Sequence, residues 1–213
     1  MQVPATPRLR GVFHQWAFFA ALAAGTTLVA LAEGVRERFA AWIYVLALAA
    51  MLGASALYHR FPWRTAAARL WARRVDHSTI FVFIAGTYTP FALLAFSGTL
   101  QIVVLAAVWG GAALGLFLNL VWIEAPRWLS AAAYLAVGWV GVIAVPEMFS
   151  GELGIGAAVL LVVGGGLYSL GALGYAAAWP NPFPATFGFH EVFHLLVVAA
   201  AVTQFVAVSL VVL

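Results

Sequence analysis

The residues best suited to chemistry in this chain lie near its end, in the segment GFHEVFH at positions 188–194. His190 and His194 are four residues apart, so on a helix they share one face and can bind one metal ion. With Glu191 between them, the segment also fits the H-E-x-x-H pattern of zinc proteases, in which the glutamate is the general base. Three interpretations stay open: a metalloprotease, another metal enzyme, or two histidines packed against neighbouring helices.

A zinc site needs three or four nitrogen, oxygen or sulfur ligands, and a catalytic site leaves one position for water. The chain contains no cysteine, so His, Asp and Glu are the candidate ligands. His59, at the end of SALYH, becomes the third ligand if its helix neighbours the one that carries His190 and His194. Asp76 could then hold or deprotonate a water on the metal. Ser55, one turn before His59, could donate a supporting hydrogen bond.

Each of these residues also has a purely structural explanation. The histidine pair could hydrogen-bond to neighbouring helices, and a serine in mid-helix most often bonds to a carbonyl one turn earlier. Asp76 follows two arginines and opens a predicted helix, where an N-cap with a salt bridge would account for it. We interpret His14 and His77 as structural, because His14 is isolated in the sequence and His77 lies off the face of Asp76.

The elements that must position these residues are membrane spans. Of the 213 residues, 65% are hydrophobic and 8% are charged, and the mean hydropathy is +1.04. Soluble domains are about half apolar and about a quarter charged, so this chain belongs in a bilayer. The first apolar stretch lacks the flanks of a signal peptide, and we expect it to be retained. The sequence pI near 9.7 does not point to nucleic acid, because the arginines lie between apolar stretches, as membrane topology requires.

Seven stretches reach the roughly 20 apolar residues that cross a bilayer. We predict spans at roughly 12–32, 39–58, 76–96, 102–122, 129–146, 154–175 and 190–213. Between the second and third spans, HRFPWRTAAARLWARRV is predicted to form an interfacial amphipathic helix with Trp63, Leu70 and Trp71 toward lipid. Residues 1–213 are therefore expected to form a single all-α domain, a polytopic bundle of seven transmembrane helices. Frequent glycines within the spans permit close helix packing.

The arginines predict how this bundle is oriented. The N-terminal end and the second, fourth and sixth connections share one side, which carries eight of the ten basic residues. Those eight are Arg8, Arg10, Arg60, Arg64, Arg69, Arg73, Arg74 and Arg127. Only Arg36 and Arg38 fall on the other side. This bias predicts a protein of the cell membrane with a cytoplasmic N-terminus and an external C-terminus. The candidate ligands and Asp76 all fall on the cytoplasmic side, although they played no part in drawing the topology.

Three motifs in this order on seven spans resemble a known family. SALYH (55–59), DHSTIFVFIAGTYTP (76–90) and GFHEVFH (188–194) are similar to those of the hemolysin III family of bacterial membrane proteins. That family belongs to a wider group with the progestin and adipoQ receptors, including the adiponectin receptors, and more distantly the alkaline ceramidases. The resemblance covers nearly the whole chain.

The resemblance implies roles for five residues. The family's Ser-x-x-x-His motif falls on Ser55 and His59, its third-span aspartate on Asp76, and its His-x-x-x-His motif on His190 and His194. In the receptors of this group the three histidines bind zinc near the cytoplasmic face, and the aspartate contacts zinc-bound water. Some relatives hydrolyse ceramide, which implies a zinc-activated water that attacks a lipid acyl linkage. The long N-terminal extension of the eukaryotic receptors has no counterpart here, so we expect no receptor role that depends on it.

Three functions remain to be compared. The favoured one is a zinc-dependent hydrolase of a lipid amide or ester, ceramidase-like, with the ligands and supporting residues just named. The second is a zincin-type protease with Glu191 as base, but LLVVAAAVTQFVAVSLVVL, which follows His194, offers no third ligand. The third is a receptor, cytolytic pore or lipid-homeostasis regulator with structural zinc, although no polar stripe along the spans favours a pore.

Overall fold

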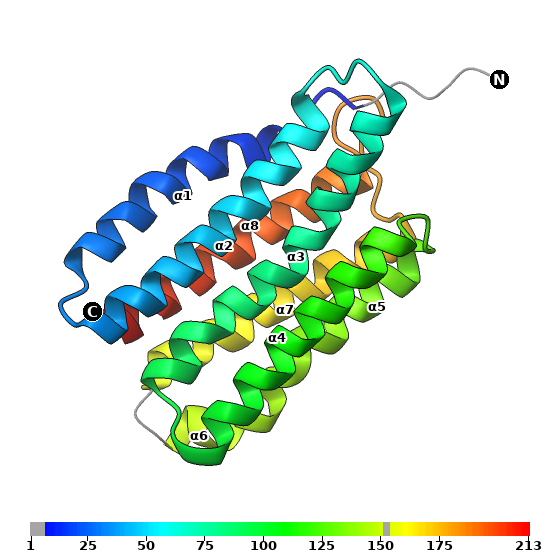
Figure 1. The fold of residues 1–213 in the computed structure, drawn as a ribbon. Coiled ribbons are helices and arrows are strands. Elements are labelled where there is room, and N and C mark those ends of the chain that lie inside the picture. The colour runs from blue at the N-terminus through cyan, green and yellow to red at the C-terminus, as the bar shows by residue number, and fades with distance from the viewer. Residues whose placement is uncertain (1–6, 151–153) are drawn as a thin grey trace.

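The fold is a bundle of long helices that run along one common direction (Figure 1). The computed structural model describes residues 7–150 and 154–213. In those ranges seven helical stretches are long and apolar enough to cross a membrane. Six of them are single helices: α1 (Val12–Leu31), α2 (Val35–Arg60), α3 (Ala66–Leu94), α4 (Gly98–Val121), α7 (Ile155–Ala177) and α8 (Phe189–Val212). The predicted seven-span all-α fold is confirmed.

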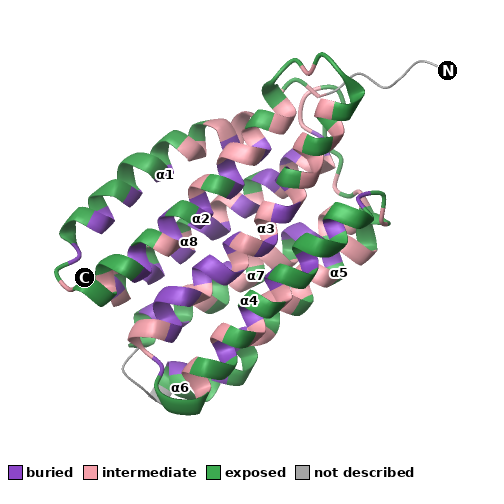
Figure 2. Ribbon diagram, viewed as in Figure 1, coloured by how far each residue is buried: buried purple, intermediate pink, exposed green. Residues whose placement is uncertain are grey.

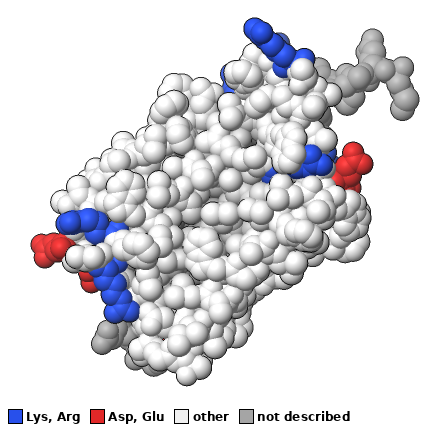
Figure 3. All heavy atoms as spheres, viewed as in Figure 1, with Lys and Arg blue, Asp and Glu red and all other residues white. Residues whose placement is uncertain are grey.

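The outside of the bundle is apolar along its length. Large side chains such as Trp16, Leu114 and Val162 are more than half exposed, and Figure 2 shows the exposed residues on the outer faces of the helices, with the buried ones turned inward. On the face seen in Figure 3, charged side chains gather at the two ends of the bundle and leave an uncharged belt between them. Such a belt suits the hydrocarbon layer of a bilayer, so this chain is a multi-pass membrane protein.

Helix α8 brings the C-terminal end of the chain beside the first three spans. It packs against α7 and also contacts α1, α2 and α3. Glycines allow the close approaches: a Cβ atom on Gly86 of α3 would collide with Ala47 of α2, and one on Gly164 of α7 would collide with Gln204 of α8. The contact between α2 and α8 makes the second and seventh spans neighbours. The three candidate ligands require this arrangement, and the sequence alone could not establish it.

Helix α3 begins ten residues earlier than its predicted span, at Ala66 instead of Asp76. The separate interfacial helix predicted for residues 59–75 is therefore wrong. Pro62 follows the end of α2, and Thr65 caps α3 because its hydroxyl accepts a hydrogen bond from the backbone N–H of Ala68 at 3.1 Å. From there to Asp76 the chain contains neither glycine nor proline, so nothing interrupts the helix.

The fifth span is broken near its middle. It consists of α5 (Arg127–Gly138), the 3-10 helix η1 (Trp139–Ala144) and α6 (Val145–Ser150), where the sequence predicted one plain span. The hydroxyl of Tyr88 on α3 donates to the carbonyl of Gly138 and accepts from the N–H of Gly141 at 3.1 Å. A side chain from a neighbouring helix thus bonds backbone groups at the break, as the absence of water in the hydrocarbon layer demands.

Candidate metal centre

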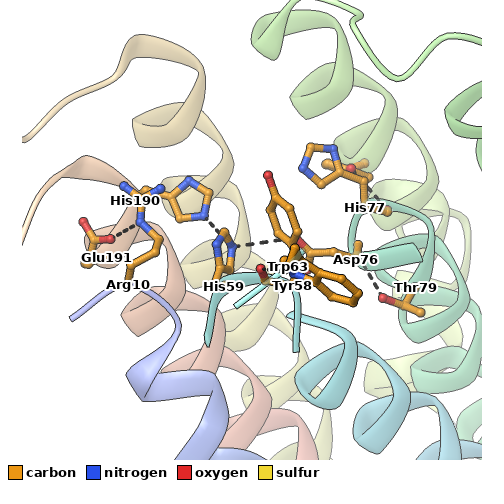
Figure 4. A network of polar contacts seen from close by, with 10 residues as sticks. Arg10, Tyr58, His59, Trp63, Asp76, His77, Thr79, His190 and Glu191 are labelled. Atoms are coloured by element: carbon orange, nitrogen blue, oxygen red, sulfur yellow. Dashed lines mark hydrogen bonds and ion pairs between the residues drawn. The ribbon is translucent and has the colours of Figure 1, made fainter. Parts of the chain in front are cut away.

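Three histidines meet where α2 ends and α8 begins. His59 lies in the last turn of α2, while His190 and His194 lie in the first two turns of α8. One ligand nitrogen from each ring can be chosen so that all three lie within 4.8 Å of one another. The Nε2 atoms of His59 and His190 are 3.2 Å apart (Figure 4). The predicted convergence of these three residues is present in the structure.

The spacing of these nitrogens fits a metal ion. Two nitrogens bound tetrahedrally to zinc at 2.0–2.1 Å lie about 3.3 Å apart, close to the separation of the His59 and His190 Nε2 atoms. The ring of His194 lies 5.1 Å from that of His59 and 4.6 Å from that of His190, centroid to centroid. Neutral imidazoles are good ligands for zinc and for several other transition metals. The donor set therefore suits a metal cofactor, and no single metal is singled out by it.

Asp76 and Ser55 lie beside this cluster. An Asp76 carboxylate oxygen is 3.7 Å from the Nε2 atom of His59, and Ser55 lines the same cavity as Asp76. Both side chains are buried. Asp76 sits ten residues inside α3, so the alternative that it caps a helix is wrong. A buried carboxylate in the interior of a membrane helix is costly and is a functional candidate by default.

Glu191 points to other partners. Its side chain is fully buried, forms an ion pair with Arg10 and accepts a hydrogen bond from the N–H of Gly188 at 2.8 Å. The second contact completes a capping box at the start of α8. In Figure 4, His59 lies between the Arg10–Glu191 pair and Asp76. Both oxygens of Glu191 are thus used in holding the helix end, and the sequence alone did not indicate this role.

The segment before α1 covers the same end of the bundle. The backbone N–H groups of Arg8 and Leu9 donate to the carbonyls of Ala185 and Thr186, in the connection that precedes α8. Gly11, at a φ of 76°, sits so close to α2 that an added Cβ atom would lie 2.6 Å from the Cβ atom of His59. Glycine is required here by both its backbone angle and its surroundings. The segment at residues 7–11 therefore closes the metal centre at this end.

His14, which the sequence predicted to be structural, packs directly against the candidate ligand His194. Its ring stacks on that of His194, with centroids 3.9 Å apart and planes 4° from parallel. It is 3% exposed, and neither of its ring nitrogens has a hydrogen-bond partner in the described part of the chain. The predicted topology could have indicated this contact, because His14 lies in the first turn of the first span, at the same end of the bundle as the other three histidines. His77, by contrast, is not part of the three-histidine cluster.

A cavity of about 220 Å³ leads away from the metal centre into the bundle. Ser55, Asp76, His190 and His194 line one part of it, and its walls are formed mainly by α3, α5, η1, α7 and α8, with smaller contributions from α1, α2 and α6. Most of the lining is apolar. The lining side chains Trp139 of η1 and Val162 of α7 are also more than half exposed on the outer surface. The cavity therefore reaches the lipid-facing side of the bundle between the broken fifth span and α7.

Comparisons with known proteins agree with this architecture. The model of a family described as Haemolysin-III related matches residues 3–205. The chain is 37% identical over 135 residues to a protein named Hemolysin-3 homolog from Bacillus subtilis (strain 168), which is 63% of this chain and 60% of that protein. It is 34% identical to Hemolysin-3 of Bacillus cereus, over 63% of this chain and 58% of that protein. Both matches span less than two thirds of the bacterial relatives. The human protein named Monocyte to macrophage differentiation factor is 26% identical over 92% of this chain and 79% of its own length.

Proposed function

This chain belongs to the haemolysin-III-related family, and on that premise we propose that it is a zinc-dependent membrane hydrolase that cleaves a lipid amide or ester. The observation that carries the proposal is the position of Asp76. A buried carboxylate lies 3.7 Å from a histidine of a three-histidine cluster, on the wall of an apolar cavity that reaches the lipid side.

His59, His190 and His194 would hold the zinc ion. When bound, zinc would supply a Lewis acid that activates water at neutral pH. Asp76 takes the proton from the attacking water as the water oxygen bonds to the acyl carbon. It then returns that proton to the leaving nitrogen or oxygen as the bond to the acyl carbon breaks, so the products are a carboxylic acid and an amine or alcohol. Ser55, which lines the cavity with Asp76, would donate a hydrogen bond that keeps the carboxylate in place.

The cavity accounts for a lipid as substrate. An acyl chain fits its apolar walls, and access between η1 and α7 lets a lipid enter from the bilayer without crossing water. In this proposal the arginine-rich end of the bundle, which contains the metal centre, faces the cytoplasm. The scissile bond is then attacked at the level of the inner leaflet headgroups.

A structural role for the metal is the second candidate. The Asp76 carboxylate lies close enough to His59 to act as a fourth ligand, and structural zinc sites are usually closed by four ligands. A protein of this kind would be a receptor, pore or regulator of lipid homeostasis. The mostly apolar cavity does not favour a conducting pore.

Turnover by the purified, zinc-loaded protein in lipid nanodiscs separates these candidates. We expect hydrolysis of a ceramide, a phospholipid or an acyl-amide probe, and an Asp76→Asn variant should keep its zinc but lose about 10²–10⁴-fold in turnover. Removing zinc with a chelator should abolish turnover while the helical bundle stays intact. If the protein holds stoichiometric zinc yet cleaves none of these lipids, or if the bundle unfolds with the chelator, the metal is structural.

A further inference from the structure

In the described part of the chain, two polar groups that line the same cavity, away from the metal centre, have no hydrogen-bond partner. Gln204 of α8 is 4% exposed, and its amide nitrogen donates to the carbonyl of Leu161 at 3.2 Å. Its amide oxygen has no hydrogen-bond partner among the described residues, and neither does the buried hydroxyl of Tyr168 on α7. Both side chains line the cavity. In hydrocarbon there is no bulk water to satisfy such groups, so each calls for a ligand or a trapped water.

The position of the Gln204 amide is set by α7. A Cβ atom on Gly164 would collide with the amide nitrogen, so the glycine makes room for the amide against the helix backbone. The hydrogen bond to the Leu161 carbonyl holds the amide nitrogen there. The amide oxygen is therefore the atom of this side chain that can accept a hydrogen bond from a molecule in the cavity. Tyr168 is one turn beyond Gly164 on α7, hence on the same helix face.

We propose that Gln204 and Tyr168 form a subsite that binds a hydroxyl group on the hydrocarbon chain of a lipid. A hydroxyl both donates and accepts: it can donate to the Gln204 oxygen and accept from the Tyr168 hydroxyl. A carbonyl would leave the glutamine oxygen unsatisfied, and an ammonium group would bring an unpaired charge into the membrane interior. A hydroxylated chain is thus the lipid class that satisfies both groups.

The position of that hydroxyl follows from helix geometry and rests on the proposed function, which places the acyl carbonyl at the histidines. Gln204 is ten residues beyond His194 on α8, about 15 Å along the axis at 1.5 Å per residue. An extended hydrocarbon chain advances about 1.25 Å per carbon, given a carbon–carbon bond near 1.52 Å. The hydroxyl is therefore expected roughly 12 carbons from the carbonyl.

Binding of fatty acids, measured without turnover, tests the subsite. Stearate, 12-hydroxystearate and 3-hydroxystearate compete with a fluorescent fatty acid on the zinc-loaded protein in nanodiscs. We expect 12-hydroxystearate to bind about five- to thirtyfold more tightly than stearate, the gain typical of one or two hydrogen bonds, and 3-hydroxystearate to show no gain. The Gln204→Leu and Tyr168→Phe variants should lose this preference and keep their affinity for stearate.

Ser78→Ala is the control. Among the described residues the Ser78 hydroxyl is also buried without a partner, but Ser78 does not line the cavity, so its variant should keep the preference. Equal affinity for stearate and 12-hydroxystearate, which a water trapped in the subsite would produce, overturns the proposal. So does a preference that survives in both subsite variants, or failure of both acids to bind. None of these results bears on whether the protein hydrolyses unsubstituted lipids, which the turnover assay decides separately.

Discussion

Replacing Glu191 by glutamine distinguishes a structural glutamate from a catalytic one. The side chain is fully buried and holds two partners, Arg10 and the N–H of Gly188. Glutamine can still accept from Gly188, but it leaves the guanidinium of Arg10 without its counter-charge. Breaking a fully buried pair costs about 3–5 kcal/mol. Arg10 is 22% exposed and can turn partly toward water, so we expect a loss of about 2–3 kcal/mol in the free energy of unfolding.

Thermal unfolding of the zinc-loaded protein in detergent measures this loss. A chain of this size loses about 2–4 °C per kcal/mol, so Glu191→Gln should melt roughly 4–12 °C lower while retaining zinc and most of its turnover. Glu33→Gln, at an exposed position between α1 and α2, is the control and should melt like the parent. Combining Glu191→Gln with Arg10→Gln should recover part of the loss. An unchanged melting temperature together with abolished turnover would refute this reasoning and favour Glu191 as a general base.

Three further predictions concern the metal and the packing of the spans. His59→Ala and His194→Ala should each lower the zinc content sharply, since two imidazoles remain; metal analysis that finds full occupancy in both would refute the assigned ligands. Gly86→Ala should destabilise the bundle by about 1–3 kcal/mol because α2 leaves no space for a methyl group. Gly110→Ala, with nothing within 4 Å of the added atom, should be neutral or stabilising by up to about 1 kcal/mol, and melting curves of the pair decide. Tyr88→Phe leaves two backbone groups at the break in the fifth span without that partner and should cost about 1–3 kcal/mol; an unchanged melt would show that the break needs no such bond.

The spans could be predicted from the sequence because the thickness of the hydrocarbon layer fixes how long each apolar stretch must be. The start of α3 could not be predicted in this way, because a helix can extend beyond the hydrocarbon layer into the polar region when its outer turns carry arginines. Arg69, Arg73 and Arg74 all lie within α3. Hydropathy marks where lipid begins, and it carries no information on where the helix itself begins.

The convergence of the three candidate ligands could be predicted because their positions at the ends of spans put them at one depth. Depth leaves the lateral order of the helices open, and that order decides which side chains touch. His14 contacts His194 only because α1 packs against α8. Glu191 meets Arg10 only because the segment before α1 crosses the start of α8. Both contacts depend on packing between segments about 180 residues apart, which no local pattern in the sequence records.

The candidate metal centre can be completed only late in synthesis. His59 and His190 are separated by 131 residues, and α8 emerges from the ribosome after the other six spans. At about 5–20 residues per second, the second and third spans would wait roughly 7–26 s before the last two imidazoles arrive. During that interval His59 has neither of the two candidate ligands of α8 beside it. A metal ion held by all three histidines would therefore mark a chain whose insertion is complete, because a product truncated before α8 lacks two of the three candidate ligands.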